Sequence, residues 1–534
     1  MTTTDMSVYN YDSLGRLTNV TFPNGSMATY NYDAMGNRTT VIEVPASVTP
    51  DCCPPTVSAL PKSLHGDMDN NAMLVLLSTG ELVGWGDNTM GALANGIATA
   101  TNAPAQRVLF NPNTTIPPFD ATIVDWALTN ANLYVVFSNG WVYSAGKNDF
   151  GQLGHGDTVG RPYLKRIEYF VTQNKSVTKV WALGGHYTTN GGGCVYFQAS
   201  DFSMYGCGAN SAGNLGNPST PTSDVSTPAP CAGIGFTTNH VVDVEIAVVN
   251  TSFSAYMLFN DGTLMVAGYN GQGQLGTGNT TNVTGSFGSA KKTGGVNITN
   301  AASISANGGR NSSTNGGNAL VLDTSGNVWT TGYNAQGQLG LGDTTNRNLF
   351  TQVTALSNIA KAEIGGGRTS YAYALTGTGV LYTWGYNGQN NLFRNNTTTP
   401  VSTPSVAPFT PGAISKVFFP NGDGLASTSA QLIVLTTSGL LAYAGADNGQ
   451  VGIDNAVNPG AYTYIASPRQ FLDGTETIAD LFVHGSLTTQ RWFVLSAAGN
   501  LYACGSNVDS ICTGGVASDV AAANVEWYKI NFSR

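Results

Sequence analysis

Short apolar runs with alternating polar residues recur along most of this chain, always in pairs joined by a turn. Four of these pairs are ALVLDTSGNVWTTG at 319–332, LYVVFSNGWVYSAG at 133–146, YMLFNDGTLMVAG at 256–268 and WFVLSAAGNLYACG at 492–505. Asn-Gly, Asp-Gly and similar pairs at the turn are typical of β-hairpins. The pattern therefore predicts antiparallel hairpins instead of helices.

Each hairpin ends at a glycine, and these glycines recur at intervals of 53 to 64 residues. They are Gly86, Gly146, Gly208, Gly268, Gly332, Gly385, Gly445 and Gly505. Another apolar segment precedes each hairpin, and a fourth short run follows it. A unit of four strands cannot bury both faces of its sheet, but a closed ring of such units can. We therefore predict an all-β fold, a closed β-propeller of four-stranded antiparallel blades. Eight blades are favoured, and seven plus an irregular unit is the alternative.

The segment after the glycine is repeated as well, with GQLG at 151–154, 273–276 and 337–340. Glycine adopts backbone angles that are closed to other residues, and leucine can fill the gap between neighbouring sheets. We expect these residues to be structural joints between blades. They are Gly151, Gln152, Leu153, Gly154, Gly273, Gln274, Leu275, Gly276, Gly337, Gln338, Leu339 and Gly340.

The repeat as a whole resembles that of the regulator of chromosome condensation family. Its parts are an apolar strand, a turn, TWG or TTG, and then GxNxxGQLGxG. The resemblance covers roughly residues 57–532 and is most specific in the second, fourth and fifth copies. It implies a β-propeller, for which seven blades are typical in the family. The family includes nucleotide-exchange factors for small GTPases, a role that the acidic balance of this chain disfavours.

The first residues follow a different pattern, YNYDSLGRLTNVTFPNGSMATYNYDAMGNRTTV at 9–41. It resembles the YD repeats of Rhs-type bacterial proteins, whose long arrays form a hollow shell. We predict a β-hairpin segment at 1–42, a proline-rich linker at 43–56 and the propeller at 57–534. So few strands are marginal in water alone, so strand addition to another molecule is one role, and an inert remnant that packs on its own propeller is the alternative. The assembly candidates are Tyr9, Tyr11, Tyr30 and Tyr32.

Charge excludes one class of partner. Only 10% of residues are charged, and the formal net charge is −9. Nucleic-acid affinity depends on clustered Lys and Arg, so we expect no nucleic-acid partner. The absence of a long apolar run argues against membrane insertion. Low charge with abundant Thr, Asn and Gly favours an extracellular or cell-surface protein, although no secretory signal is recognisable at the start of the sequence.

The seven cysteines have no paired CxxC spacing of a zinc site. Cys194 and Cys207 flank a predicted hairpin, and Cys504 and Cys512 are close in sequence. Two disulfides are therefore one interpretation, and buried thiols are the other.

No catalytic motif, metal-ligand spacing or phosphate-binding loop is recognisable, so we expect no enzyme activity and no cofactor. Equivalent turns of successive blades share one rim of a propeller, where polar side chains can form a binding face. They can equally be solvated loop residues or, for the histidine at 186, a structural side chain. The candidates are Asp67, His186, Arg310, Arg368, Asp423 and His484.

These observations favour a non-enzymatic structural or interaction protein that binds other proteins, including copies of itself. Self-assembly into a filament through the N-terminal hairpin is one form of this role. A carbohydrate- or protein-binding module of an Rhs-like polypeptide is the first alternative, with a glycan as the ligand. A polysaccharide-active enzyme is the second.

Overall fold

The computed structural model divides the chain into two compact units, Met1–Pro54 and Pro55–Arg534. Only the backbone is described for the strand residues within 8–66 and for 103–104, 463–464, 480, 482–484, 491, 504–506 and 523–530. The described residues are 8–11, 17–21, 27–32, 38–44, 61–66, 72–96, 98, 103–129, 131–183, 193–234, 239–249, 251–308, 316–366, 369–394, 396–408, 412–419, 431–438, 441–445, 463–464, 477–484, 491–506 and 523–530.

The first unit contains a four-stranded antiparallel sheet in the order β1-β2-β3-β4. Its strands are β1 (Val8–Tyr11), β2 (Leu17–Thr21), β3 (Met27–Tyr32) and β4 (Arg38–Val44). The register shifts between Asn10 and Tyr11 in the first hairpin and between Asn31 and Tyr32 in the second. The two YD copies therefore form equivalent hairpins, which β2 and β3 join into one sheet.

The second unit is an eight-bladed propeller of four-stranded antiparallel sheets, which confirms the predicted fold and the favoured blade number. Blades 1 to 4 consist of β5 (Pro61–Gly66), β6 (Ala72–Leu77), β7 (Leu82–Gly86), β8 (Ala103–Arg107); β9 (Ile123–Leu128), β10 (Asn132–Phe137), β11 (Val142–Gly146), β12 (Arg161–Arg166); β13 (Val177–Leu183), β14 (Cys194–Ala199), β15 (Met204–Gly208), β16 (Val225–Pro230); and β17 (Val241–Val249), β18 (Ser252–Phe259), β19 (Leu264–Gly268), β20 (Val283–Ser289).

Blades 5 to 8 follow the same order. They consist of β23 (Ala301–Asn307), β24 (Asn318–Asp323), β25 (Val328–Gly332), β26 (Arg347–Gln352); β27 (Ile359–Gly365), β28 (Tyr371–Thr376), β29 (Leu381–Gly385), β30 (Val401–Val406); β31 (Ile414–Phe418), β32 (Gln431–Thr436), β33 (Leu441–Gly445), β34 (Thr463–Tyr464); and β35 (Ile478–His484), β36 (Arg491–Ser496), β37 (Leu501–Ser506), β38 (Ala523–Ile530). A small hairpin, β21 (Lys291–Lys292) and β22 (Val296–Asn297), extends the outer edge of blade 5.

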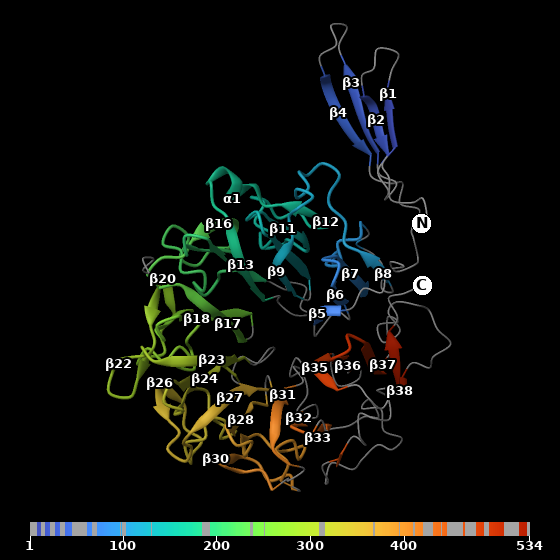
Figure 1. The fold of residues 1–534 in the computed structure, drawn as a ribbon. Helices are drawn as coiled ribbons and strands as arrows, with labels where there is room; N and C mark the ends of the chain where they lie inside the picture. Colours follow the sequence, from blue (N-terminus) through green and yellow to red (C-terminus); the bar gives the residue numbers. More distant parts are fainter. Residues whose placement is uncertain are drawn as a thin grey trace. The chain divides into compact units, whose positions relative to one another are not determined.

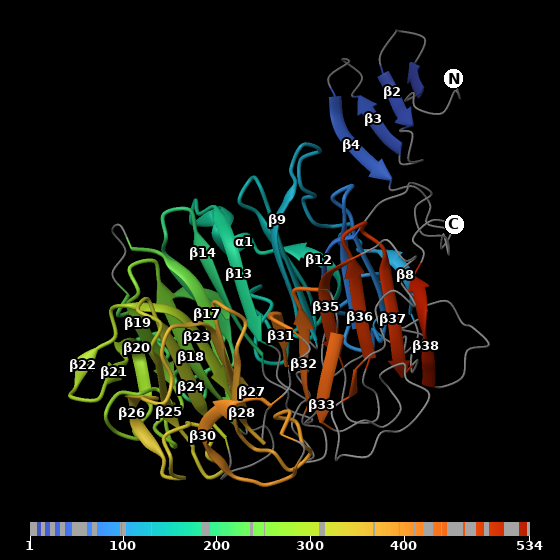
Figure 2. The same ribbon diagram turned by 60° about the horizontal axis from the view of Figure 1, so that its bottom comes forward.

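The first strand of every blade lies nearest the centre of the ring (Figure 1). These inner strands are β5, β9, β13, β17, β23, β27, β31 and β35, and the sheets stand side by side around them (Figure 2). Apolar side chains fill the space between neighbouring sheets. At the closure of the ring, Phe493 and Ala503 of blade 8 pack with Met73, Val75 and Trp85 of blade 1.

Glycine is required where the third strand of a blade ends. Gly146 has φ of 112°, and a Cβ atom there would lie 1.9 Å from the carbonyl oxygen of Ala131. Both the backbone angle and the neighbouring chain therefore exclude a side chain. This explains why the sequence places a glycine at this point of every repeat.

The joints after these glycines are held by a recurring hydrogen bond. The Asn148 side-chain oxygen accepts from the backbone N–H of Leu153, whose side chain is fully buried. The same bond, 2.8 to 3.1 Å long, recurs at Asn88, Asn148, Asn210, Asn270, Asn334 and Asn387. Within GQLG, the Gln152 side-chain oxygen accepts from the N–H of Phe150, and Gln274 and Gln338 make equivalent bonds. Buried side chains thus satisfy the backbone of a linker that pairs with no strand.

The described part of the chain contains one short helix, α1 (Glu168–Thr172), after the last strand of blade 2. No helix among the described residues is long and apolar enough to cross a membrane.

Of the two interpretations for Cys194 and Cys207, the disulfide is wrong and the buried thiols are confirmed, because both cysteines are free and buried. Cys207 is paired with Val195 across β14 and β15, so it shares a face of the sheet with Val195. Cys194 is adjacent to Val195 along β14 and therefore points to the other face. Cys504 and Cys512 lie outside the residues whose side chains are described, and their pairing stays a prediction.

Candidate functional site

The polar rim candidates from the sequence are not placed by the structure. Their side chains all lie outside the described residues, so their role stays a prediction; they are Asp67, His186, Arg310, Arg368, Asp423 and His484. The same holds for the side chains of Tyr9 and Tyr11 in β1 and of Tyr30 and Tyr32 in β3.

The inner strands share a register that the structure repeats in all eight blades. The pairing with the second strand skips one residue, the second of each inner strand. A β-bulge of this kind re-aims the side chains that follow it. The residue after the bulge is polar in every blade; the eight are Ser63, Asp125, Lys179, Asp243, Ser303, Lys361, Lys416 and Asp480.

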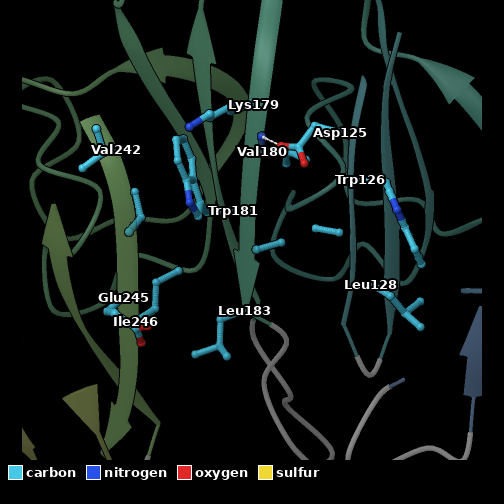
Figure 3. Close-up of a pocket in the computed structure, with 13 residues that line it drawn as sticks. Asp125, Trp126, Leu128, Lys179, Val180, Trp181, Leu183, Val242, Glu245 and Ile246 are labelled. Atoms are coloured by element: carbon cyan, nitrogen blue, oxygen red, sulfur yellow. Dashed lines mark hydrogen bonds between the residues drawn. The ribbon is translucent and has the colours of Figure 1, made fainter. Parts of the chain in front are cut away.

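Polar side chains of one inner strand reach the next blade. An Asp125 side-chain oxygen accepts from the backbone N–H of Val180 at 2.8 Å (Figure 3). The Ser305 hydroxyl both accepts from the N–H and donates to the carbonyl of Ile364, at 3.1 Å. The Lys416 ammonium donates to the carbonyl of Ala479 at 2.8 Å. Each bond satisfies one or two backbone groups at the edge of an inner strand, where unpaired groups can otherwise pair with another strand.

A groove of about 520 Å³ lies along the inner strands of blades 2, 3 and 4. We call it the wall groove. It is lined by Asp125, Trp126, Ala127 and Leu128 of β9, Lys179, Val180, Trp181, Ala182 and Leu183 of β13, and Val242, Val244, Glu245 and Ile246 of β17. Figure 3 shows the labelled side chains of the three strands. Its volume is within the range of small-ligand and peptide sites.

In three of the inner strands, the residue after the bulge and the residue two positions further on form a side-chain pair. The charges in the pair differ between the three strands. In β13 the Lys179 ammonium lies 5.6 Å from the centre of the Trp181 ring. In β27 the Lys361 ammonium lies 3.0 Å from a carboxylate oxygen of Glu363. In β17 the corresponding pair is Asp243 and Glu245, two acids. The pair in β17 is therefore the one of the three that brings like charges together.

The pKa values of the acidic side chains in the wall groove are raised. Burial raises the pKa of Asp125 and of Asp243, and in both cases the charge of Lys179 opposes the shift. Burial, followed by the negative charges of Asp243 and Glu363, raises the pKa of Glu245 to about 8. Strongly perturbed acids in a groove are typical of binding or catalytic sites. Among the described residues no group of three or more His, Cys, Asp or Glu side chains has the arrangement of a metal site.

A second feature lies on the loop that leads into β9. Residues 116–119, Ile-Pro-Pro-Phe, form an exposed tip that we call the blade 2 finger; Ile116 is 51% exposed and Phe119 is 107% exposed. The base of the loop is fixed to the outer strands of blade 2. The N–H of Arg166 donates to the Thr114 hydroxyl at 3.1 Å, and the Tyr143 hydroxyl donates to the carbonyl of Thr115 at 2.8 Å.

The other end of the finger is fixed as well. The N–H of Ala121 donates to the carbonyl of Pro118 at 2.9 Å, and the N–H of Thr122 donates to the hydroxyl of Ser138 at 3.1 Å. Two consecutive prolines restrict the backbone between these ends. The finger therefore displays an aromatic ring on a restrained loop.

Sequence reasoning missed the wall groove. It treated VTKVWAL and VVDVEIAVV as apolar strands and searched the turns between strands for polar groups. The signal was available, because a polar residue occupies the third position of all eight inner strands. Sequence reasoning also did not identify the exposed ring of the blade 2 finger.

Two family models match the chain. The Regulator of chromosome condensation (RCC1) repeat matches residues 139–189 and 325–370, and the RHS Repeat matches residues 11–44. The RCC1 matches include the joints of blades 2 and 5, and the RHS match includes β2, β3 and β4. Both resemblances stated from the sequence are therefore confirmed.

Curated relatives include the ultraviolet-B receptor UVR8 of Arabidopsis thaliana, which is 25% identical over 395 residues, or 64% of this chain and 81% of the receptor. The X-linked retinitis pigmentosa GTPase regulator of Homo sapiens is 38% identical over 77 residues, 14% of this chain and 8% of the regulator. Protein RCC2 of Mus musculus is 33% identical over 99 residues, 18% of this chain and 19% of RCC2. The chain thus spans most of UVR8 but less than a fifth of the other two.

Solved structures that match the chain include human WBSCR16, with a TM-score of 0.49 and 18% identity over 76% of this chain and 96% of that one. Prp20p from Saccharomyces cerevisiae, described with its binding to Gsp1p and histones, has a TM-score of 0.46 and 16% identity over 76% and 89% of the two chains. This chain carries RCC1-type repeats in an eight-bladed propeller and an RHS repeat in its first four-stranded sheet.

Proposed function

We propose that the chain is a non-enzymatic protein-interaction module in which the propeller holds binding surfaces in fixed positions. The observation that carries this proposal is the blade 2 finger. A fully exposed Phe119 ring is unfavourable in water, and buried aromatic anchors supply much of the affinity of protein interfaces. Because hydrogen bonds already fix both ends of the loop, little conformational entropy is lost when a partner covers the ring.

The experiment compares two serine substitutions of exposed apolar residues. Phe119→Ser removes the anchor, and Val296→Ser is the matched control, because Val296 is 64% exposed in β22 of blade 5. Both proteins and the wild type are used as baits under cross-linking conditions. We expect the wild type and the control to retain the same partner, and Phe119→Ser to lose it with an unchanged melting temperature. Identical partners for all three proteins contradict the proposal.

A further part of the proposal is self-assembly outside the cell through the first unit. The order β1-β2-β3-β4 leaves β1 and β4 as the edges of its sheet, and edge strands pair readily with another chain. A heterologous contact of this kind forms an open filament. Electron microscopy of the purified protein with and without residues 1–54 tests this route; unchanged assembly after the deletion rules it out. Surface protease treatment of producing cells tests the location.

Glycan binding is the alternative that a specific observation favours. The wall groove combines the partly exposed Trp181 ring with hydrogen-bonding acids, and sugar rings stack on such aromatic faces. A glycan array with the wild type and Trp181→Ala tests this alternative, and incubation of the same glycans with the protein detects any cleavage.

A further inference from the structure

We infer that the wall groove binds a cationic side chain, a guanidinium or alkylammonium group carried by an extended segment of a partner protein. The inference rests on the proposed interaction function and adds the chemistry of one ligand. It depends on the wall groove and not on the blade 2 finger, so the two can fail separately.

The first step is the missing counter-charge at Glu245. No hydrogen bond or ion pair joins this side chain to another residue that the structure describes. Its charged neighbours are Asp243 on the same strand and Glu363 of blade 6, both negative. Burial and these two negative neighbours raise the pKa of Glu245 to about 8, because its charged form lacks the compensation that buried charges need.

The second step is that the lysines described on the inner strands of blades 3, 6 and 7 have other partners. Lys361 forms its ion pair with Glu363, and Lys416 donates to the carbonyl of Ala479. Lys179 acts electrostatically on Asp125 and Asp243, and it lies over the Trp181 ring. Among the residues that the structure describes, no Lys or Arg side chain is paired with Glu245, so a cation from another molecule can bind there.

The third step is that the wall groove fits more than a bare ion. Its lining includes Leu128, Leu183 and Ile246, against which the methylene stem of an arginine or lysine can pack. The Trp181 ring already faces one ammonium group, and an aromatic face attracts cations. Acid, ring and aliphatic wall together match an arginine or lysine side chain better than a metal ion.

The fourth step is access. The wall groove runs along three adjacent inner strands, so a chain in an extended conformation can follow it. The Asp125 and Ser305 side chains engage part of the backbone of these edges. Recognition here therefore depends on the ligand's side chains more than on strand addition.

The experiment uses two peptides that differ in charge alone. One is acetyl-Gly-Arg-Gly-Arg-Gly-amide, and the other carries citrulline, the neutral isostere of arginine, at both arginine positions. The full chain is labelled with 5-fluorotryptophan, and Trp181→Phe assigns the fluorine resonance of residue 181. We expect the arginine peptide to shift this resonance with saturation and the citrulline peptide to leave it in place.

The matched variants are Glu245→Gln in the wall groove and Glu81→Gln outside it. Both remove one carboxylate charge, and Glu81 lies in blade 1, paired with Arg107 at 3.1 Å. At pH 9, where Glu245 is ionised, we expect Glu245→Gln to weaken arginine-peptide binding about tenfold and Glu81→Gln to leave it unchanged. If Glu245→Gln does not fold, the salt dependence of the wild-type titration replaces it, and affinity must fall as salt rises.

Three results overturn the inference: equal shifts with both peptides, no shift with the arginine peptide, or equal binding by the two Glu→Gln variants. A shift with chitohexaose but not with the arginine peptide also overturns it and assigns the wall groove to a glycan. None of these results affects the test of the blade 2 finger, so failure of the inference and failure of the proposed function are distinguishable.

Discussion

At the scale of single residues, Glu245 is the group whose chemistry conflicts most with its surroundings. Its pKa is raised from 4.5 to about 8, so the folded protein keeps a proton that the unfolded chain releases. The contribution of this group to stability is therefore complete below about pH 4.5, and it is lost as the pH rises to about 8. Tyr256, whose pKa the charge of Glu245 helps to raise, and the acids Asp243 and Glu363 face it.

Glu245→Gln removes this titration. We expect the melting temperature of the variant to match that of the wild type at pH 4.5 and to exceed it by about 1–3 °C at pH 9. Differential scanning calorimetry across this range measures the difference. Glu81→Gln is the control and should show no such rise. A constant difference at all pH values would mean that the raised pKa of Glu245 does not affect stability.

Binding of the arginine peptide should depend on the same proton. Arginine stays charged throughout this range, so any change between pH 6 and pH 9 comes from the protein. Because the carboxylate form of Glu245 attracts the cation, we expect affinity to rise as the pH passes about 8. The fluorine titration at several pH values measures this rise. Glu245→Gln should show a flat profile, and a wild-type affinity that falls with pH contradicts the prediction.

At the scale of the element, substitution of the glycine that ends the third strand of a blade tests how strongly the joint depends on this residue. In Gly146→Ala the new Cβ meets the Ala131 carbonyl oxygen and the backbone has a left-handed φ, so we expect a loss of about 3 kcal/mol or more. Gly377→Ala is the control, because no atom lies within 4 Å of its Cβ position. Urea unfolding should place the control within about 0.5 kcal/mol of the wild type.

The sequence predicted these joints because repetition exposes them. A glycine and an asparagine that return with every blade can be recognised without coordinates, and Asn148 and Leu153 behave as the pattern implies. The wall groove could not be found in this way, because Trp181 and Glu245 differ from blade to blade and meet across strands of different repeats. The wrong disulfide has a related cause. Closeness of Cys194 and Cys207 in a hairpin did not reveal that they point to opposite faces.

At the scale of the whole molecule, the propeller depends on closing its ring. Blades 1 and 8 come from opposite ends of the second unit, and the structure places β35 against β5. The closing cluster is small and aromatic, with Phe493 and Trp85 both fully buried. Every other blade boundary joins neighbours in sequence, so this one carries the largest loop-closure cost.

Phe493→Ala therefore tests closure. Its cavity should cost about 3–5 kcal/mol, as a buried aromatic truncation does elsewhere. The matched control is Phe350→Ala. The Phe350 side chain is fully buried between blades 4 and 5, so this variant removes the same side-chain volume at a boundary between blades that are neighbours in sequence. We expect similar losses of stability in the two variants, but hydrogen exchange should rise locally at blades 1 and 8 only in Phe493→Ala. The exchange is expected to stay local because separation of blades 1 and 8 leaves the contacts between all other neighbouring blades intact. Equal and uniform exchange in both variants would mean that the ring unfolds as one cooperative unit, in which the closing contact has no special role.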